Sequence, residues 1–285
     1  MHEPTIPTVP ETLDGWACLH EFFRVNWPLW NAQSKEKREH IASQLQAHLE
    51  KNRSFSQENG QSASFVVLGH KADLLLLHFR SSLDQLSQAE LEFMQSEFYP
   101  YVERTTSYVS FVELGMYELT KKMHHELVEQ GLTPNDPDWK KQWNQKLQDQ
   151  SKLMKDRIYP EIPLQRYLCF YPMDKKRSDQ NNWYQVSMDD RQDMMREHGM
   201  IGRKYAGQVK QIISGSIGSD DFEWGVDLFA QDPLVFKKLI YEMRFDRASA
   251  LYAHFGPFYA GLQFSPSETQ AFLSGKTPEL QKIKN

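Results

Sequence analysis

The sequence predicts an α+β fold with two similar halves, each an antiparallel sheet with helices on one face. The main observation is an internal similarity between residues 64–98 and residues 210–245. Each segment reads as a strand, a Gly-containing turn, a second strand and an amphipathic helix with apolar residues three and four positions apart. Such a repeat indicates that one folding unit occurs twice in the chain.

An earlier strand and helix precede each repeat and complete the unit. The strand-like residues 12–27 lead into the helical pattern SKEKREHIASQLQAHLEKN, and the strand-like residues 166–177 lead into SMDDRQDMMREH. The order β-α-β-β-α is that of a ferredoxin-like module. Two such modules side by side form a dimeric α+β barrel, with antiparallel sheets inside and helices outside.

This pattern divides the chain into three parts. We expect an N-terminal ferredoxin-like module over 1–100, a connector over 101–165, and a C-terminal module over 166–285 that carries the functional site. The connector starts like a strand and then becomes polar and rich in Lys and Gln, which favours solvent-facing helix from about 118 to 156 with a break from Gly131 to Pro137. Its adjacent His124 and His125 point about 100° apart on a helix, which disfavours a shared metal site.

Composition excludes several classes of protein. With 40% hydrophobic and 25% charged residues, the chain has the composition of a soluble globular protein. Its net charge of −5 argues against general binding to nucleic acid or anionic membranes. No apolar run approaches the roughly 20 residues of a spanning helix. Cys18 and Cys169 lie in separate apolar runs, so we expect buried free thiols and a cytoplasmic location.

The stretch FYPMDKKR places a phenol at the boundary between an apolar strand and a cationic cluster. Tyr171 ends the apolar part, and Lys175, Lys176 and Arg177 follow it. From these residues alone, Tyr171 is a tyrosine anchored at a strand end, with solvated cations beyond it.

The segment SMDDRQDMMREHGM has the signals of a short helix that ends at a histidine. Ser187 is placed as N-cap with Asp190 three residues on, and Gly199 follows His198 where a left-handed residue ends many helices. One interpretation is that His198 caps the helix or interacts with the negative end of its dipole.

A second interpretation makes His198 an axial ligand of haem iron. Arg191, Met194 and Met195 precede it at steps of three and four, so the methionines and the histidine share one helix face. A single histidine on a Met-lined face suits haem iron better than zinc, which needs three or four ligands.

Other polar residues lie in apolar surroundings and allow two interpretations each. Gln211 alternates with Val209 and Ile213 on one face of a strand. It is either an ordinary core or edge glutamine or a hydrogen-bond donor to a ligand on iron. Arg157 and Arg244 are either snorkelling or ion-paired arginines, or clamps for carboxylates.

Three segments together resemble coproheme decarboxylases, the hydrogen peroxide-dependent haem synthases of Gram-positive bacteria in the chlorite dismutase superfamily. They are FYPMDKKR, NNWYQVSMDDRQDMMREHGMIGRKYAGQVKQIISGSIGSDDFEWGVDLF and FKKLIYEMRFDRASALYAHFGPF. The resemblance covers nearly the whole chain and is densest over residues 157–258. It implies a cytoplasmic homopentamer, without membrane or nucleic-acid binding, that contacts coproporphyrin ferrochelatase transiently.

The resemblance also implies the reaction. Fe-coproporphyrin III (coproheme) would be both substrate and redox cofactor, and hydrogen peroxide the oxidant. Two of its four propionates would be decarboxylated to vinyls through a tyrosyl radical, giving haem b by way of a three-propionate intermediate. This reaction is the last step of coproporphyrin-dependent haem biosynthesis.

Residue by residue, the resemblance assigns roles to the positions that match the family motifs. Tyr171 would be the catalytic tyrosine, Lys175 its companion, His198 the axial iron ligand and Gln211 the distal residue. Further contacts with the substrate would come from the residues Arg157, Pro172, Met173, Asp174, Arg244, Ser249 and Tyr117. The match at Tyr117 is weaker because the neighbouring connector is longer than expected for the family. Phe222 stands where relatives often carry Trp.

Two other functions fit parts of the same pattern. Chlorite dismutases and related peroxidases share the fold, but the dismutases carry a distal arginine where this chain has Gln211, and they lack YPMDKK. A haem carrier or sensor could bind porphyrin through His198 alone. It would not need Tyr171 among propionate-binding cations.

Overall fold

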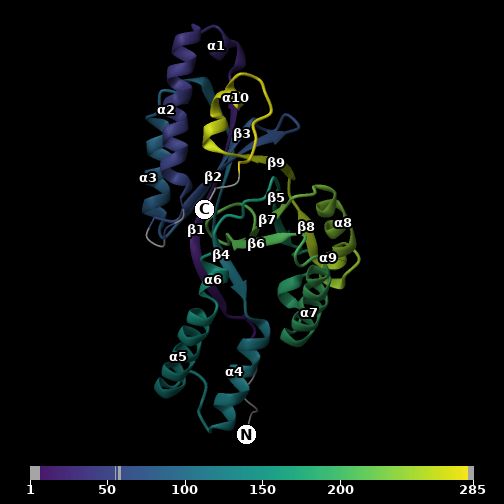
Figure 1. Ribbon diagram of the computed structural model, residues 1–285. Coiled ribbons are helices and arrows are strands. Elements are labelled where there is room, and N and C mark those ends of the chain that lie inside the picture. The colour runs from purple at the N-terminus through teal and green to yellow at the C-terminus, as the bar shows by residue number, and fades with distance from the viewer. Residues whose placement is uncertain (1–6, 55, 57–58, 282–285) are drawn as a thin grey trace.

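The chain forms one closed antiparallel barrel in a computed structural model that describes residues 7–54, 56 and 59–281 (Figure 1). The strand order is β7-β6-β4-β1-β3-β2-β9-β5-β8, and a further pairing of β5 with β7 closes the ring. The fold is therefore the α+β barrel expected from the repeat.

The barrel consists of two sheets with the same internal order. The first sheet contains β1 (Thr12–Val25), β2 (Gln61–Leu68), β3 (Leu74–Arg80) and β4 (Val102–Gly115) in the order β4-β1-β3-β2. The second contains β5 (Tyr167–Lys175), β6 (Lys210–Gly215), β7 (Trp224–Ala230) and β9 (Tyr259–Phe264) in the order β9-β5-β7-β6. Pairing of β4 with β6 and of β2 with β9 joins the sheets, and the short β8 (Ala253–Phe255) extends β9 along β5.

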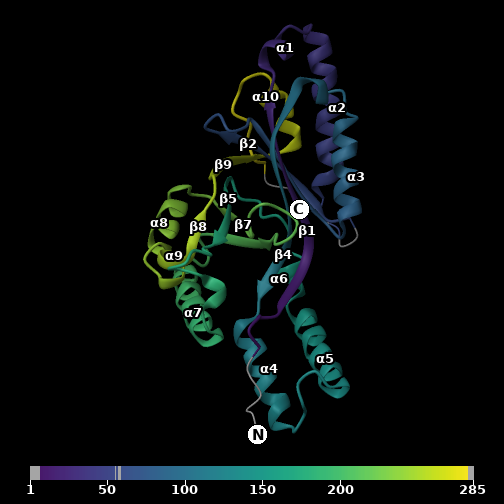
Figure 2. The ribbon, with the colours of Figure 1, turned by 180° about the vertical axis from the view of Figure 1, so that it is seen from behind.

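Helices cover the outside of each sheet (Figures 1 and 2). The first half carries α1 (Trp27–Asn31), α2 (Lys35–Arg53), the turn η1 (Tyr99–Tyr101) and α3 (Leu83–Met94), and η3 (Pro266–Glu268) and α10 (Thr269–Leu273) pack beside α2. The second half carries η2 (Trp183–Gln185), α7 (Met188–Lys204), α8 (Leu234–Met243) and α9 (Arg247–Tyr252).

The segment between the two halves contains a strand and a helical extension. Its strand-like start is β4, which lies in the first sheet beside β1. Beyond β4, α4 (Tyr117–Glu129) and α5 (Pro137–Leu153) form a hairpin that projects away from the barrel, followed by α6 (Lys155–Ile158). The break between α4 and α5 includes Gly131 in the left-handed region, with φ of 77°. The division of the chain at residues 100 and 165 stays a prediction.

Aromatic side chains from both halves fill the barrel. The core contains Phe22 and Phe79 from the first half and Phe170 and Phe229 from the second. At its centre the fully buried His20 lies 3.0 Å from the Asp227 carboxylate, which links β1 to β7. The two cysteines are buried and free, as expected. Within the described residues, no helix has the length and apolar character needed to cross a membrane.

Candidate functional site

The candidate site lies on the outer face of the second sheet, beneath α7, α8 and α9. Alternation along β5 puts Phe170 into the barrel core and Tyr171 into a separate apolar cluster on the outer face. Residues of β7 and α8 contribute to this cluster, and the partly buried Ile201 of α7 packs against it. The cluster forms an apolar wall between sheet and helices.

Tyr171 is buried in that wall with 4% of its surface exposed. Its ring centroid lies 4.6 Å from that of Phe258 and 5.7 Å from that of Phe255. Burial raises the pKa of the Tyr171 phenol, while the nearby charge of Arg244 acts in the opposite direction. The phenol is therefore protonated at neutral pH, and its oxidation must release a proton.

Lys175 lies four residues further along the same face of β5. Only 8% of its surface is exposed, and its Nζ lies 4.5 Å from the centre of the Trp183 ring. Burial lowers the pKa of Lys175 to about 8, although the charges of Asp246 and Glu223 oppose this shift. A lysine in this state has both its charged and its neutral form accessible near neutral pH.

The other candidates on β5 divide between its two faces. Met173 lies between Tyr171 and Lys175 and packs against the outer cluster. Asp174 faces the other way, where its carboxylate accepts a hydrogen bond from the Glu223 backbone N–H at 2.8 Å. Pro172 shares that opposite face because side chains alternate along a strand. The structure thus brings Met173, but not Pro172 or Asp174, to the face of Tyr171.

His198 is not the last residue of its helix, contrary to the expectation from the sequence. Ser187 is the N-cap as predicted, but α7 continues through Gly199 and ends at Lys204. The left-handed glycine lies later, at Gly207, with φ of 83°. Contacts of α7 with α8 and α9 outweigh the helix cost of glycine, about 1 kcal/mol. His198 is consequently neither a C-cap nor at the negative end of the dipole.

A buried carboxylate orients the His198 ring instead. Its Nδ1 lies 2.9 Å from the Asp246 carboxylate, and 25% of the imidazole side chain is exposed. Burial tends to raise the pKa of Asp246, but hydrogen bonds from His198 and Ser249 outweigh it, and the pKa is lowered. An ionised Asp246 therefore accepts a hydrogen bond from His198 Nδ1–H, which leaves the lone pair on Nε2 available to a ligand.

Ser249 forms hydrogen bonds with Asp246 and lies close to His198. Its backbone N–H donates to Asp246 Oδ1 at 2.8 Å, which caps the start of α9, and its hydroxyl donates to Asp246 Oδ2 at 3.1 Å. The same hydroxyl lies 3.4 Å from His198 Nδ1. The geometry places Ser249 behind the imidazole, as a support for Asp246.

Gln211 lies on the expected face of β6. It pairs with Leu228, a member of the cluster around Tyr171, and Val209 on the same face of the chain packs against that cluster. Its half-buried amide is a polar group on an apolar wall. This position lets the amide donate a hydrogen bond to a ligand without adding charge.

The remaining candidates lie at different distances from this centre. The Arg244 guanidinium lies 4.8 Å from the centre of the Phe255 ring, which itself contacts Tyr171. Tyr117 packs against the cluster that contains Trp183 and thus borders the Lys175 end. Arg157 is exposed on α6, whose neighbours are β1 and β4 of the first half.

Three residues of the site were missed from the sequence: Asp246, Trp183 and Glu223. Asp246 had a usable signal, because Asp is one of the residues preferred at a helix N-cap and α9 starts directly after it. Neither Trp183 nor Glu223 had a local signal, since each reaches Lys175 only through the tertiary fold.

The register of the strands identifies the equivalent face in the first half. Glu21 lies opposite Leu76 in the β1–β3 pair, and Tyr171 lies opposite Val226 in the β5–β7 pair. Leu76 lies three residues before the core residue Phe79 in β3, and Val226 lies three residues before the core residue Phe229 in β7. Leu76 and Val226 are therefore equivalent positions. Glu21 therefore takes the place of Tyr171.

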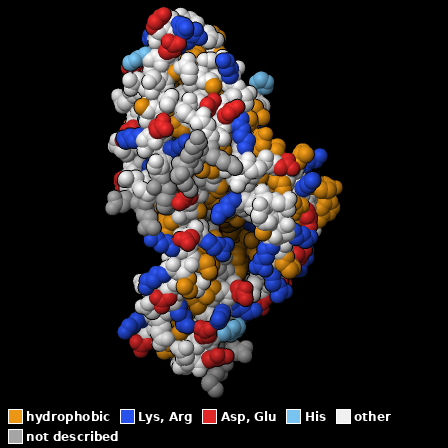
Figure 3. Space-filling view, in the orientation of Figure 1, with side chains coloured by type: hydrophobic (Ala, Val, Ile, Leu, Met, Phe, Trp, Pro, Cys, Tyr) orange, Lys and Arg blue, Asp and Glu red, His pale blue; other side chains and the backbone are white. Residues whose placement is uncertain are grey.

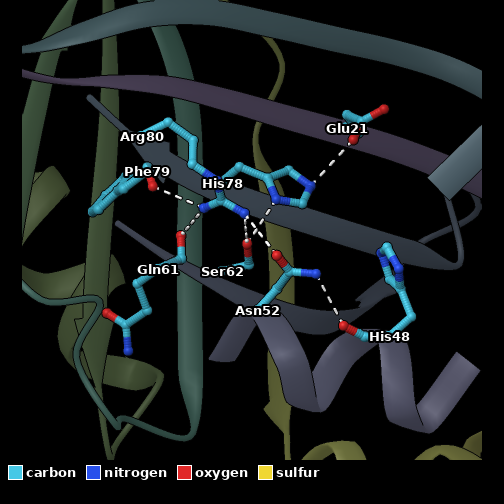
Figure 4. Close-up of polar contacts among 8 residues, drawn as sticks. All are labelled: Glu21, His48, Asn52, Gln61, Ser62, His78, Phe79 and Arg80. Carbon is cyan, nitrogen blue, oxygen red and sulfur yellow. Dashed lines mark hydrogen bonds and ion pairs between the residues drawn. The ribbon is translucent and has the colours of Figure 1, made fainter. Parts of the chain in front are cut away.

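A chain of polar groups linked by hydrogen bonds and one ion pair occupies that equivalent face (Figure 4). Arg80 donates to the Ser62 hydroxyl at 2.9 Å, Ser62 lies 2.8 Å from His78 Nδ1, and His78 Nε2 lies 3.2 Å from Glu21. By the same register, Ser62 takes the place of Gln211. The two halves share a backbone plan and each has an apolar cluster on its outer face, but the first half carries Glu21 and Ser62 where the second carries Tyr171 and Gln211.

The residues around the second-half site fit an iron porphyrin with acidic side chains. His198 offers an oriented nitrogen, the wall is apolar, and Lys175 and Arg244 supply cations. Figure 3 shows a hollow beside α7 with hydrophobic side chains in its wall and Lys and Arg side chains at its rim. An anionic macrocycle needs both features, since burying an unpaired carboxylate is costly.

Comparison with known proteins agrees with this interpretation. A family model described as chlorite dismutase matches residues 38–264. A coproheme decarboxylase of Staphylococcus carnosus is 43% identical over 91% of this chain and 95% of its own length. A solved structure of a heme-binding protein from Thermus thermophilus has a TM-score of 0.78 and 38% identity, covering 96% of this chain and 100% of that one.

Some relatives are much longer. A protein of Natronomonas pharaonis, named for proposed heme binding, is 42% identical over 94% of this chain, but the chain spans only 42% of its length. The family assignment does not depend on that relative, because the family model covers most of the chain and the Staphylococcus carnosus protein matches almost end to end. The chain belongs to the chlorite dismutase family.

Proposed function

We propose that the chain is a coproheme decarboxylase that converts two propionates of Fe-coproporphyrin III to vinyls with hydrogen peroxide, yielding haem b. The observation that carries the proposal is the row formed by Tyr171 and Lys175 on one face of β5, beside a histidine oriented by Asp246. A haem carrier would need His198 but would not need Tyr171 and Lys175 beside each other on β5. The similarity to a coproheme decarboxylase supports the same choice.

The chain's own residues have separable tasks in this proposal. His198 would hold the substrate iron through Nε2, and bound coproheme together with peroxide would supply the oxidising power. Gln211 would donate a hydrogen bond on the opposite side of the porphyrin. The apolar wall excludes water from the reacting edge.

Tyr171 would transfer the oxidation to a propionate. Loss of one electron and one proton converts the phenol to a tyrosyl radical, which takes a hydrogen atom from the propionate β-carbon. Loss of carbon dioxide and a second electron then leaves a vinyl group. Each conversion releases one carbon dioxide, two electrons and two protons, one of which is the carboxylic proton. One hydrogen peroxide takes up the two electrons and two protons and becomes two waters.

Lys175 and Arg244 would hold the substrate carboxylates. As an ammonium, Lys175 pairs with the reacting propionate, and in its neutral form it accepts the phenolic proton of Tyr171; its pKa of about 8 allows both roles. The guanidinium of Arg244 offers a two-pronged hydrogen bond to a carboxylate. The wider proposal includes a cytoplasmic homopentamer and transient contact with coproporphyrin ferrochelatase.

The test is to add coproheme and then peroxide and to follow the porphyrin by mass spectrometry. We expect sequential loss of two carboxyl groups in the wild type, and coproheme binding with little haem b in Tyr171→Phe. Tyr259→Phe is a matched control, because Tyr259 is also buried but packs in the barrel core. Binding without any mass change in the wild type would favour the carrier. Full turnover by Tyr171→Phe would refute the radical role.

A further inference from the structure

Glu223 is a buried carboxylate next to the Lys175 end of the candidate site. Its residue is 6% exposed, and it lies just before β7, opposite the end of β5. Carboxylates are seldom this buried unless they are paired. A negative charge here also lies beside the region in which a substrate carboxylate would bind, so its presence requires a reason.

The contacts of Glu223 converge on the end of β5. Its Oε2 accepts a hydrogen bond from the Lys175 backbone N–H at 2.8 Å, and its Oε1 lies 3.7 Å from Arg177. Its own backbone N–H donates to Asp174 at 2.8 Å. Tyr184 also forms a hydrogen bond with the Glu223 side chain. Glu223 therefore holds several parts of the segment that follows Met173.

We propose that Glu223 is a positioning residue for Lys175: it fixes the backbone at the end of β5 and supplies the negative charge that keeps the Lys175 ammonium in place for a substrate carboxylate. This inference rests on the proposed function for its purpose, but its geometry does not depend on it. The Lys175 ammonium lies over the Trp183 ring, 4.5 Å from its centre. A fixed backbone at Lys175 therefore fixes the position of this ammonium.

The surroundings of Lys175 combine two carboxylates with an aromatic ring. In the part of the chain that the structure describes, Glu223 and Asp246 act on its charge, from the turn before β7 and from the start of α9. The turn η2 contributes the uncharged Trp183 ring. His254 of β8 faces Asp174 at 3.4 Å on the other side of β5. Because burial already favours neutral lysine, removing the charge of Glu223 must lower the proton affinity of Lys175.

Two substitutions separate the backbone contact from the charge. Glu223→Gln keeps an oxygen that accepts from the Lys175 backbone N–H but removes the charge, whereas Glu223→Ala removes both. Asp221→Asn is the matched control, since Asp221 is an exposed carboxylate two residues away in the same turn. The conservative Glu223→Asp is expected to restore the charge effect in part.

The first readout uses the protein without porphyrin. Lysine labelled with ¹³C is followed by NMR against pH, and the Lys175 signal is assigned from its loss in Lys175→Arg. We expect the titration midpoint of Lys175 to fall by about half a unit in Glu223→Gln, roughly a threefold loss of proton affinity, and to stay at its wild-type value in Asp221→Asn.

The second readout is coproheme affinity. Glu223→Gln should bind within about twofold of wild type at pH 6 and about threefold more weakly at about pH 8.5, because its Lys175 has lost more of its protons. Glu223→Ala should be weaker at both pH values. Equal midpoints and superimposable affinity curves for Glu223→Gln and wild type would overturn the inference, even if Glu223→Ala does not fold. A shifted midpoint in a protein that makes no haem b would uphold it and reject the proposed function instead.

Discussion

Substitution of Asp246 tests how the fold orients His198, the proposed iron ligand. Asp246 accepts from His198 Nδ1 at 2.9 Å and from the Ser249 backbone N–H at 2.8 Å, so one carboxylate both orients the imidazole and caps α9. Asparagine is as good an N-cap as aspartate, whereas alanine is not. Asp246→Asn therefore removes the charge at the imidazole while α9 keeps its cap, and Asp246→Ala removes both.

The expected magnitudes differ between the two variants. Asp246→Ala loses a helix cap, about 1 kcal/mol, and removes the hydrogen-bond partner of a partly buried imidazole N–H, about 1–3 kcal/mol. We expect its free energy of unfolding to fall by about 2–4 kcal/mol and that of Asp246→Asn to fall by less. Loss of a carboxylate behind a ligating histidine typically costs about 10–100-fold in affinity for the metal, so both variants should bind coproheme about that much more weakly.

Guanidinium unfolding and absorption titration with coproheme measure the two quantities. Asp232→Asn is the control, because Asp232 accepts from the Leu234 backbone N–H at 3.0 Å at the start of α8 and is exposed. Coproheme affinity of Asp246→Asn within twofold of wild type would refute the assignment of Asp246 as the group that orients His198. An unchanged stability of Asp246→Ala would refute its capping role.

Three further perturbations have defined outcomes. Burial lowers the pKa of His78 and of His48 in the folded protein. The unfolded chain therefore binds more protons below about pH 6.5, and the free energy of unfolding falls on acidification by up to about 1.4 kcal/mol per pH unit for each histidine. Urea unfolding at several pH values should show a smaller dependence of this free energy on pH in His78→Gln than in wild type. Gly15→Ala would put a methyl group 1.7 Å from the Ile158 carbonyl oxygen, so β1 and α6 must separate; a loss of less than about 1 kcal/mol in the free energy of unfolding would contradict this packing. We expect the coproheme affinity of wild type to decline as pH rises through about 8, because Lys175 then loses its charge. Lys175→Met should bind more weakly at about pH 6.5 and lack this decline. The exposed Lys152→Met serves as the control, and a decline that persists in Lys175→Met would assign it to another group.

Much of the fold followed from local patterns. Both repeats form the expected strands and helices because their apolar spacing matches the period of each element. Ser187 caps α7 as predicted, since a cap depends only on neighbouring residues. One local interpretation was wrong: Tyr171 is not at a strand end with solvated cations beyond it, because β5 continues to Lys175, which is buried.

Sequence signals gave the wrong helix end, and missed a hydrogen-bonded pair, where contacts between distant residues determine the structure. Gly199 reads as a helix end, but packing of α7 against α8 and α9 carries the helix on to Lys204. The same packing brings Asp246 to His198 across 48 residues of sequence. No window of the sequence contains both groups, so their pairing had no local signature.

By itself, the sequence determined the repeated β-α-β-β-α plan and the family resemblance, because these depend on the order and periodicity of residues along the chain. Only the tertiary structure decided that the two sheets close through β4–β6 and β2–β9, that Asp246 orients His198, and that Glu223 and Trp183 surround Lys175. Those contacts join segments far apart in the chain, and their geometry is set by how sheets and helices pack, which periodicity does not encode.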